Sequence, residues 1–109
     1  MNNKYKIKLM TEFLHGPIWV YDKEGFIDSL SLVEEDFIIK ELDKEMADMY
    51  SSYYEFDSHD EACWFNKEKQ KEDKPKMLEL LSKLKLRLNE INDGSFEIED
   101  LITLEYEKL

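Results

Sequence analysis

The chain has 109 residues, of which 42% are hydrophobic and 38% are charged, and its formal net charge at pH 7 is −11. The length fits a single domain over residues 1–109, and the apolar content, with only three glycines and two prolines, excludes a disordered chain. No apolar run reaches the roughly 18 residues that span a bilayer, and a single cysteine excludes an internal disulfide. We therefore expect a soluble domain located in the cytosol.

The negative charge is concentrated in the central third of the chain. Residues 23–62 contain three lysines and thirteen acidic residues, whereas residues 1–22 and 63–109 carry net charges of only +1 and −2. A field of this sign repels nucleic acid and anionic membranes and attracts basic surfaces. We therefore expect a basic protein as partner, with no direct binding to nucleic acid or membrane.

The first third of the chain predicts a small antiparallel meander. Residues 5–9 alternate between apolar side chains and lysines, the period-two pattern of a half-buried strand. A β-branched and aromatic run over 18–21 predicts a second strand. A tight turn at 22–25, with Gly25 free to adopt a positive φ, leads into a short third strand at 26–27. Because three strands alone are marginal, helices must cover one face.

Two long helices are predicted in the rest of the chain. Residues 34–55 place apolar side chains at helical spacing without glycine or proline, and Ser31 with Glu34 predicts a capping box at the start. A second amphipathic helix begins near Met77 and ends at residues 92–94, where Gly94 is the expected left-handed cap. Pro75 is either the first residue of this helix or a kink in one already running.

Residues 58–66 allow two interpretations. Ser58 and Glu61 have the spacing of a second capping box, which predicts a helix through Phe65. Alternatively, Asn66 is the N-cap of the following helix, and residues 62–65 add an extended strand to the sheet. Further on, Phe96 and Ile98 alternate in a short strand. The last segment, 101–109, favours a short helix over a strand.

The predicted fold is therefore α+β: a small antiparallel β-meander of three to four strands packed against two long helices, with a short C-terminal helix.

The segment 50–66 combines six aromatic residues with clustered carboxylates, materials suited to a recognition surface. The structural alternative is that the rings belong to the core and the acids to a solvated helix end. Asp57, His59, Asp60 and Glu61 offer ligands to a divalent ion, but solvation and helix capping explain them better. Cys63 and His59 would share a helix face as a thiolate pair, yet acidic surroundings raise a thiol pKa and favour a buried structural cysteine. We expect no metal, no cofactor and no enzymatic activity.

Several stretches, YKIKLMTEF, GPIWVYD, MYSSYYEFDSHDEACWFN and RLNEINDGSFEIED, resemble small bacterial proteins encoded beside polymorphic toxins and contact-dependent growth inhibition systems. The resemblance extends over nearly the whole chain. It implies an immunity protein, which binds and neutralises a cognate toxin, often a basic nuclease. The resemblance transfers no functional residue to this chain.

The hypothesis assigns partner binding to an acidic face on the first long helix and the loop after it. Carboxylates there would speed association, while desolvated aromatic rings would set the lifetime of the complex. The expected partner-binding residues are Glu41, Asp48, Tyr53, Tyr54, Glu55, Asp57, Asp60, Glu61 and Trp64. The alternatives are a structural or regulatory interaction module, including a homodimer built on the exposed face of the meander or on Trp19, and a small metal-dependent enzyme.

Overall fold

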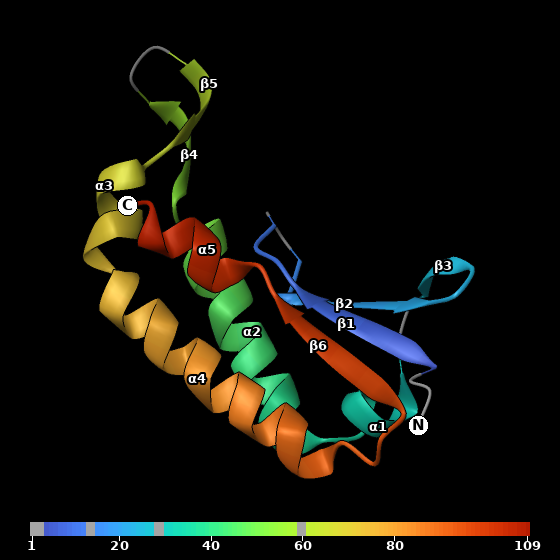
Figure 1. The fold of residues 1–109 in the computed structure, drawn as a ribbon. Helices are drawn as coiled ribbons and strands as arrows, with labels where there is room; N and C mark the ends of the chain where they lie inside the picture. Colours follow the sequence, from blue (N-terminus) through green and yellow to red (C-terminus); the bar gives the residue numbers. More distant parts are fainter. Residues whose placement is uncertain (1–3, 13–14, 28–29, 59–60) are drawn as a thin grey trace.

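The computed structural model describes residues 4–12, 15–27, 30–58 and 61–109, with only the backbone described for 56–58 and 61–63. It is an α+β fold in which helices cover one face of a four-stranded sheet and a separate β-hairpin extends from the body (Figure 1). The sheet has the order β3-β2-β1-β6. Its strands are β1 (Tyr5–Leu9), β2 (Ile18–Asp22), β3 (Gly25–Ile27) and β6 (Phe96–Asp100).

The first three strands form the predicted antiparallel meander. β1 pairs with β2 from Lys6 opposite Tyr21 to Leu9 opposite Ile18, and β2 pairs with β3 across a tight turn. In that turn Gly25 has φ +129°, and its backbone N–H donates to Asp22 Oδ1 at 3.1 Å. β6 extends this meander to a mixed sheet, because it pairs parallel to β1. The long helix directly before β6 returns the chain to the end of the sheet where β1 begins, so the two strands run in one direction.

Two short helices accompany the two long ones. The helices are α1 (Ser31–Glu34), α2 (Phe37–Ser51), α3 (Lys67–Glu72), α4 (Lys74–Ile91) and the C-terminal α5 (Ile102–Glu107). The predicted capping box is wrong, since Ser31 lies inside α1 and caps nothing. Asp36 is the actual N-cap of α2, where its Oδ1 accepts the backbone N–H of Ile39 at 2.9 Å. The first long helix ends at Ser51 instead of extending to residue 55 as predicted.

Residues 54–65 form the β-hairpin, with β4 (Tyr54–Ser58) antiparallel to β5 (Glu61–Phe65). This decides between the two interpretations of residues 58–66. The helical one is wrong, and the strand with Asn66 as N-cap is confirmed, because Asn66 Oδ1 accepts the N–H of Lys69. The strand does not add to the main sheet, however. Figure 1 shows the hairpin extending away from the sheet.

The core lies between the inner face of the sheet and helices α2 and α4. Ile7 and Leu9 of β1 are fully buried, as the alternating pattern predicted. The helices contribute their apolar stripes: Ile39, Leu42, Met46 and Tyr50 from α2, and Met77, Leu80, Leu81, Leu84 and Leu88 from α4. Pro75 lies in the first turn of α4, and Gly94 (φ +95°) follows its end.

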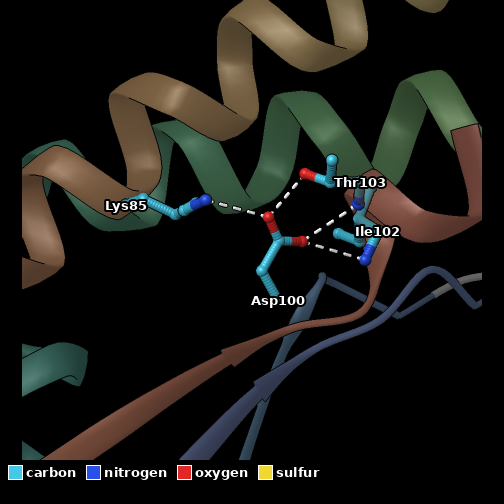
Figure 2. A network of polar contacts seen from close by, with 4 residues as sticks. All are labelled: Lys85, Asp100, Ile102 and Thr103. Atoms are coloured by element: carbon cyan, nitrogen blue, oxygen red, sulfur yellow. Dashed lines mark hydrogen bonds and ion pairs between the residues drawn. The ribbon is translucent and has the colours of Figure 1, made fainter. Parts of the chain in front are cut away.

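Asp100 joins three elements at the end of β6. Its Oδ1 accepts the backbone N–H groups of Ile102 and Thr103 at 3.0 Å each, at the start of α5. Its Oδ2 accepts the Thr103 hydroxyl at 2.5 Å and Lys85 Nζ of α4 at 2.9 Å (Figure 2). Strand, C-terminal helix and α4 therefore meet at one carboxylate. Within the described ranges, no helix is both long and apolar enough to cross a membrane.

Candidate functional site

A cleft of about 620 Å³ lies where the inner face of β2 meets α1 and the N-terminal half of α2. In this region β3 lies clear of the two long helices (Figure 1). Apolar side chains, among them Ile18, Val20 and Val33, line the cleft together with the carboxylates of Glu34, Glu41 and Asp43. We call these three residues the cleft acids. A concave site with an apolar lining and a few polar groups is the usual form of a binding pocket.

Asp43 is the most constrained of the cleft acids. It is half-buried and accepts the backbone N–H of Ile18. Burial raises the pKa of its carboxyl, outweighing that N–H and the nearby His15, which both favour the charged form, while Glu34 raises the pKa further. Gly16 passes so close that a Cβ at this position would overlap the Asp43 carboxylate. The Gly16-Pro17 segment therefore belongs to the wall of the cleft.

His15 forms one rim of the cleft. Its Nδ1 donates to the carbonyl oxygen of Gly16 at 2.5 Å, and its ring stacks on Trp19 with centroids 3.9 Å apart and an angle of 17° between the planes. These contacts hold the imidazole in one orientation beside Asp43. A ring held in this way is suited to shaping a pocket wall.

The cleft acids have no cationic partner, in contrast to several carboxylates elsewhere in the described residues. Asp36 pairs with Arg87 at 2.7 Å, Asp100 with Lys85 at 2.9 Å, and Asp48 with Lys44 at 3.7 Å. None of the ion pairs within 4 Å among the described residues involves a cleft acid. Lys40 and Lys44 also line the cleft, but Lys44 is paired with Asp48. A negative potential therefore remains over the cleft.

The residues predicted to bind a partner are distributed along α2 and the hairpin that follows it. Glu41 and Asp48 are exposed on one stripe of α2, two turns or about 10 Å apart. Only Glu41 lines the cleft. Tyr53 is fully buried, so its ring belongs to the core instead of a contact surface. Tyr54 is half-buried and packs edge-on against Phe65, with centroids 4.9 Å apart.

The remaining predicted residues belong to the hairpin. Glu55 Oε2 accepts the side-chain N–H of Asn66 at 2.7 Å, and Trp64 lies opposite Glu55 in the hairpin register. Asp57 and Glu61 are placed by their backbone in β4 and β5, and Asp60 lies outside the described residues. Glu41 lies in the N-terminal half of α2, whereas the hairpin extends from its C-terminal end, so Glu41 and strands β4 and β5 do not form one continuous face (Figure 1).

Asp43 and His15 are not among the residues that the sequence predicted to bind a partner. One signal could have directed attention to them. Gly16-Pro17 is the only pairing of these residues in the chain, and a glycine between two strands often marks a close approach of the backbone. What it approaches depends on how α2 packs against β2, which a local pattern does not contain.

Among the described residues, the lining of the cleft contains no serine, threonine or cysteine. In the part of the chain that the structure describes, no three His, Cys, Asp or Glu residues are arranged to hold a metal ion.

Comparisons with known proteins identify no relative. No protein-family model, no curated protein and no solved structure matches the chain.

Proposed function

We propose that this protein is a non-enzymatic binding protein of the cytosol that neutralises a basic protein, in the manner of an immunity protein acting on its toxin. The observation that carries the proposal is the cleft beside α2, where three carboxylates converge on an apolar lining without the cationic partner that Asp36 and Asp100 have elsewhere in the fold. A lysine or arginine from a partner would supply the missing charge. The net charge of −11 adds long-range attraction for such a partner.

The cleft offers both apolar and charged contacts to a basic side chain. Its apolar lining can contact the alkyl stem of an inserted lysine or arginine, while the cleft acids receive the charged end. Half-buried Asp43 is the strongest partner, since charge pairs excluded from water interact more strongly than exposed pairs. A toxin that uses such cations to hold nucleic acid would lose them on binding, which would inhibit it.

The test compares two sets of carboxylates in one protein. This protein is first used as bait to isolate a basic partner from the organism that encodes it. The rate at which this protein associates with the purified partner is then measured. The combined Glu34→Gln, Glu41→Gln and Asp43→Asn substitutions should slow association about tenfold at low salt and reduce its salt dependence. The matched control, Asp57→Asn with Asp60→Asn and Glu61→Gln, removes the same number of charges from the hairpin and should change the rate less.

Two results would count against the proposal. If the hairpin substitutions slow association and the cleft substitutions do not, the binding face is the one expected from the sequence alone. If the purified partner keeps its full activity when saturated with this protein, inhibition is ruled out.

A second candidate function, a homodimeric interaction module, is supported by the outer face of the sheet. There Trp19, Tyr21 and Phe26 form a ring cluster, with the Phe26 ring 5.6 Å from Trp19 and 5.8 Å from Tyr21, and Phe26 is 49% exposed. Exposed aromatic clusters are common at protein interfaces. Light scattering over a range of concentrations decides this candidate: a dimer that Phe26→Ser converts to monomer supports it, and a monomeric wild-type chain excludes it.

A further inference from the structure

β6 forms one edge of the four-stranded sheet and has β1 as its only strand neighbour among the described residues. An unpaired edge exposes backbone donors and acceptors that can pair with another strand. Three features that commonly prevent an edge strand from pairing are absent from β6. It contains no proline, it pairs with β1 without a bulge, and at five residues it is not unusually short.

The direction of each backbone group follows from two bonds at the ends of the strand. The carbonyl of Ser95 accepts the N–H of Tyr5, and the N–H of Leu101 donates to the carbonyl of Leu9. Because successive residues of a strand direct their N–H and C=O groups to alternate sides, Ser95, Leu101 and the odd-numbered residues between them face β1. Ile98 therefore directs both its N–H and its C=O toward the open edge. The other outward carbonyl near the start of the strand, that of Phe96, already accepts Asn92 Nδ2 at 2.9 Å.

A groove of about 520 Å³ runs beside this edge, between β6 and α4. Phe96 and Ile98 line its strand side, while Lys85 and Asn89 line its helix side. Lys85 reaches across one end of the groove to Asp100 (Figure 2). From Phe96 to Asp100 the edge is about 13 Å long, which suits an extended segment of about five residues. Grooves between an edge strand and a helix are a known geometry for peptides that add a strand to a sheet.

The charges along β6 indicate which kind of segment would bind at this edge. Glu97 and Glu99 project from the outer face, where their side chains are 55% and 39% exposed, and only Lys6 pairs with them, at 3.7 and 3.5 Å. A second copy pairing through the same edge would bring these carboxylates against their counterparts, and like charges on facing strands are destabilising. A segment with lysine or arginine at the two positions opposite Glu97 and Glu99 would be attracted instead.

We infer that the open edge of β6 binds an extended basic segment of a partner protein by strand addition. The segment runs antiparallel to β6, so that the residue opposite Ile98 exchanges two backbone hydrogen bonds with it and directs a small apolar side chain into the groove. The flanking basic residues pair with Glu97 and Glu99 on the outer face. This edge and the cleft beside α2 are separate surfaces, so binding at one does not require binding at the other.

The experiment uses the whole protein and a synthetic probe, the acetylated and amidated pentapeptide TKVKT, whose valine is meant to lie opposite Ile98 in an antiparallel pairing. Amide exchange is followed by NMR. In the free protein the Ile98 amide should exchange faster than those of Glu97 and Glu99, which bond to β1. At about 90% occupancy the peptide should slow exchange at Ile98 about tenfold, with no comparable change at Asp43 in the cleft.

Two matched probes separate backbone pairing from charge attraction. The same peptide with an N-methyl group on its valine keeps the charge but loses a backbone donor, and it should give less than half of the protection at Ile98. The acidic analogue TEVET should give none. In the protein, Ile98→Pro deletes the outward N–H and should abolish binding, whereas Ile98→Val should preserve it.

Three results would overturn the inference. These are equal effects of the peptide and its N-methyl analogue, protection that appears in the cleft instead of at Ile98, and protection of Ile98 that grows with protein concentration without peptide. The last result would make a second copy the occupant. Because the two peptides are compared on unmodified protein, the test does not depend on the folding of Ile98→Pro.

Discussion

Asp43 and Asp100 are both partly buried aspartates, yet their surroundings shift their pKa values in opposite directions. Burial alone would raise the pKa of the Asp100 carboxyl, but hydrogen bonds from Thr103 and the charge of Lys85 outweigh it and hold the pKa below its usual range. At Asp43 the same penalty of burial prevails, and the pKa is raised. Asp100 is satisfied within the fold and stabilises it. Asp43 lacks a cation and is available to one from outside.

The largest expected effect tests the structural role of Asp100. Asp100→Ala removes four hydrogen bonds and leaves Lys85 unpaired, so the free energy of unfolding should fall by about 2–4 kcal/mol. Urea unfolding followed by circular dichroism measures the change. Thr103→Val, which deletes only one of the four bonds, is the control and should cost less. A loss below about 1 kcal/mol for Asp100→Ala would contradict the role assigned to this carboxylate.

A second structural carboxylate, Asp36, should show an intermediate effect. It caps α2 through Ile39 N–H and binds Arg87 through both carboxylate oxygens, at 2.7 to 3.2 Å. Asp36→Ala should cost about 1–2 kcal/mol from loss of the cap alone. Asp36→Ser preserves a cap and loses only the ion pair, so its thermal midpoint should fall less. Equal midpoints for the two variants would mean that the cap contributes little.

The pH dependence provides the sharpest test of the comparison. A raised pKa makes ionisation of Asp43 unfavourable to folding, so its contribution to stability is complete below pH 3.8 and is lost as pH rises through the folded pKa. Asp43→Asn should therefore stabilise the protein at pH 7 and make little difference at pH 3.

For Asp100 the sign reverses. A lowered pKa means that its contribution is present above pH 3.8 and is lost as pH falls through the folded pKa. Asp100→Asn should destabilise the protein at pH 7, and the difference should shrink toward pH 2. Unfolding of both variants from pH 2 to pH 7 measures the two slopes. Slopes of the same sign would refute the contrast between these residues.

The smallest expected effect concerns the buried hydroxyls of Tyr53 and Tyr106. They lie near each other, and Tyr106 lies near Gln70, yet neither makes a well-formed hydrogen bond within the described part of the chain. Burial raises the pKa of Tyr106 to about 12. Tyr53→Phe removes one hydroxyl and keeps the ring, so the free energy of unfolding should change by less than about 0.5 kcal/mol. Tyr53→Ala should cost several times more, because it removes a ring with no exposed area.

Patterns over a few consecutive residues of the sequence predicted the strands, turns and helices that form mainly through interactions between residues close in the chain. The alternation in β1, the glycine turn before β3 and the apolar stripe of α4 were each visible in the sequence and are present in the structure. The end of α2 was not predictable in the same way, because residues 50–54 continue the helical spacing of aromatic side chains. Tyr53 and Tyr54 instead leave the helix, and their rings pack around Tyr50 and Phe65 at the base of the hairpin.

The candidate site shows the same limit. The excess of acid in the central third was evident from composition, and it supported a basic partner. The six acidic residues predicted to bind a partner were chosen because they lie in one stretch of the sequence. In the structure, however, Glu41 lies in the N-terminal half of α2, and the hairpin follows the C-terminal end of this helix. Asp43 gained importance only through Gly16 and Ile18, which are more than twenty positions away in the chain.

The sequence by itself determined the α+β composition, most of the strands and helices, and the negative charge, because each depends on local spacing or on a sum over residues. The tertiary structure decided which carboxylates meet a cation and which do not. It also decided that β6 joins β1 in parallel and leaves its other edge open. Ion pairing and strand order depend on contacts between distant segments, and a pattern of neighbouring residues contains no record of those contacts.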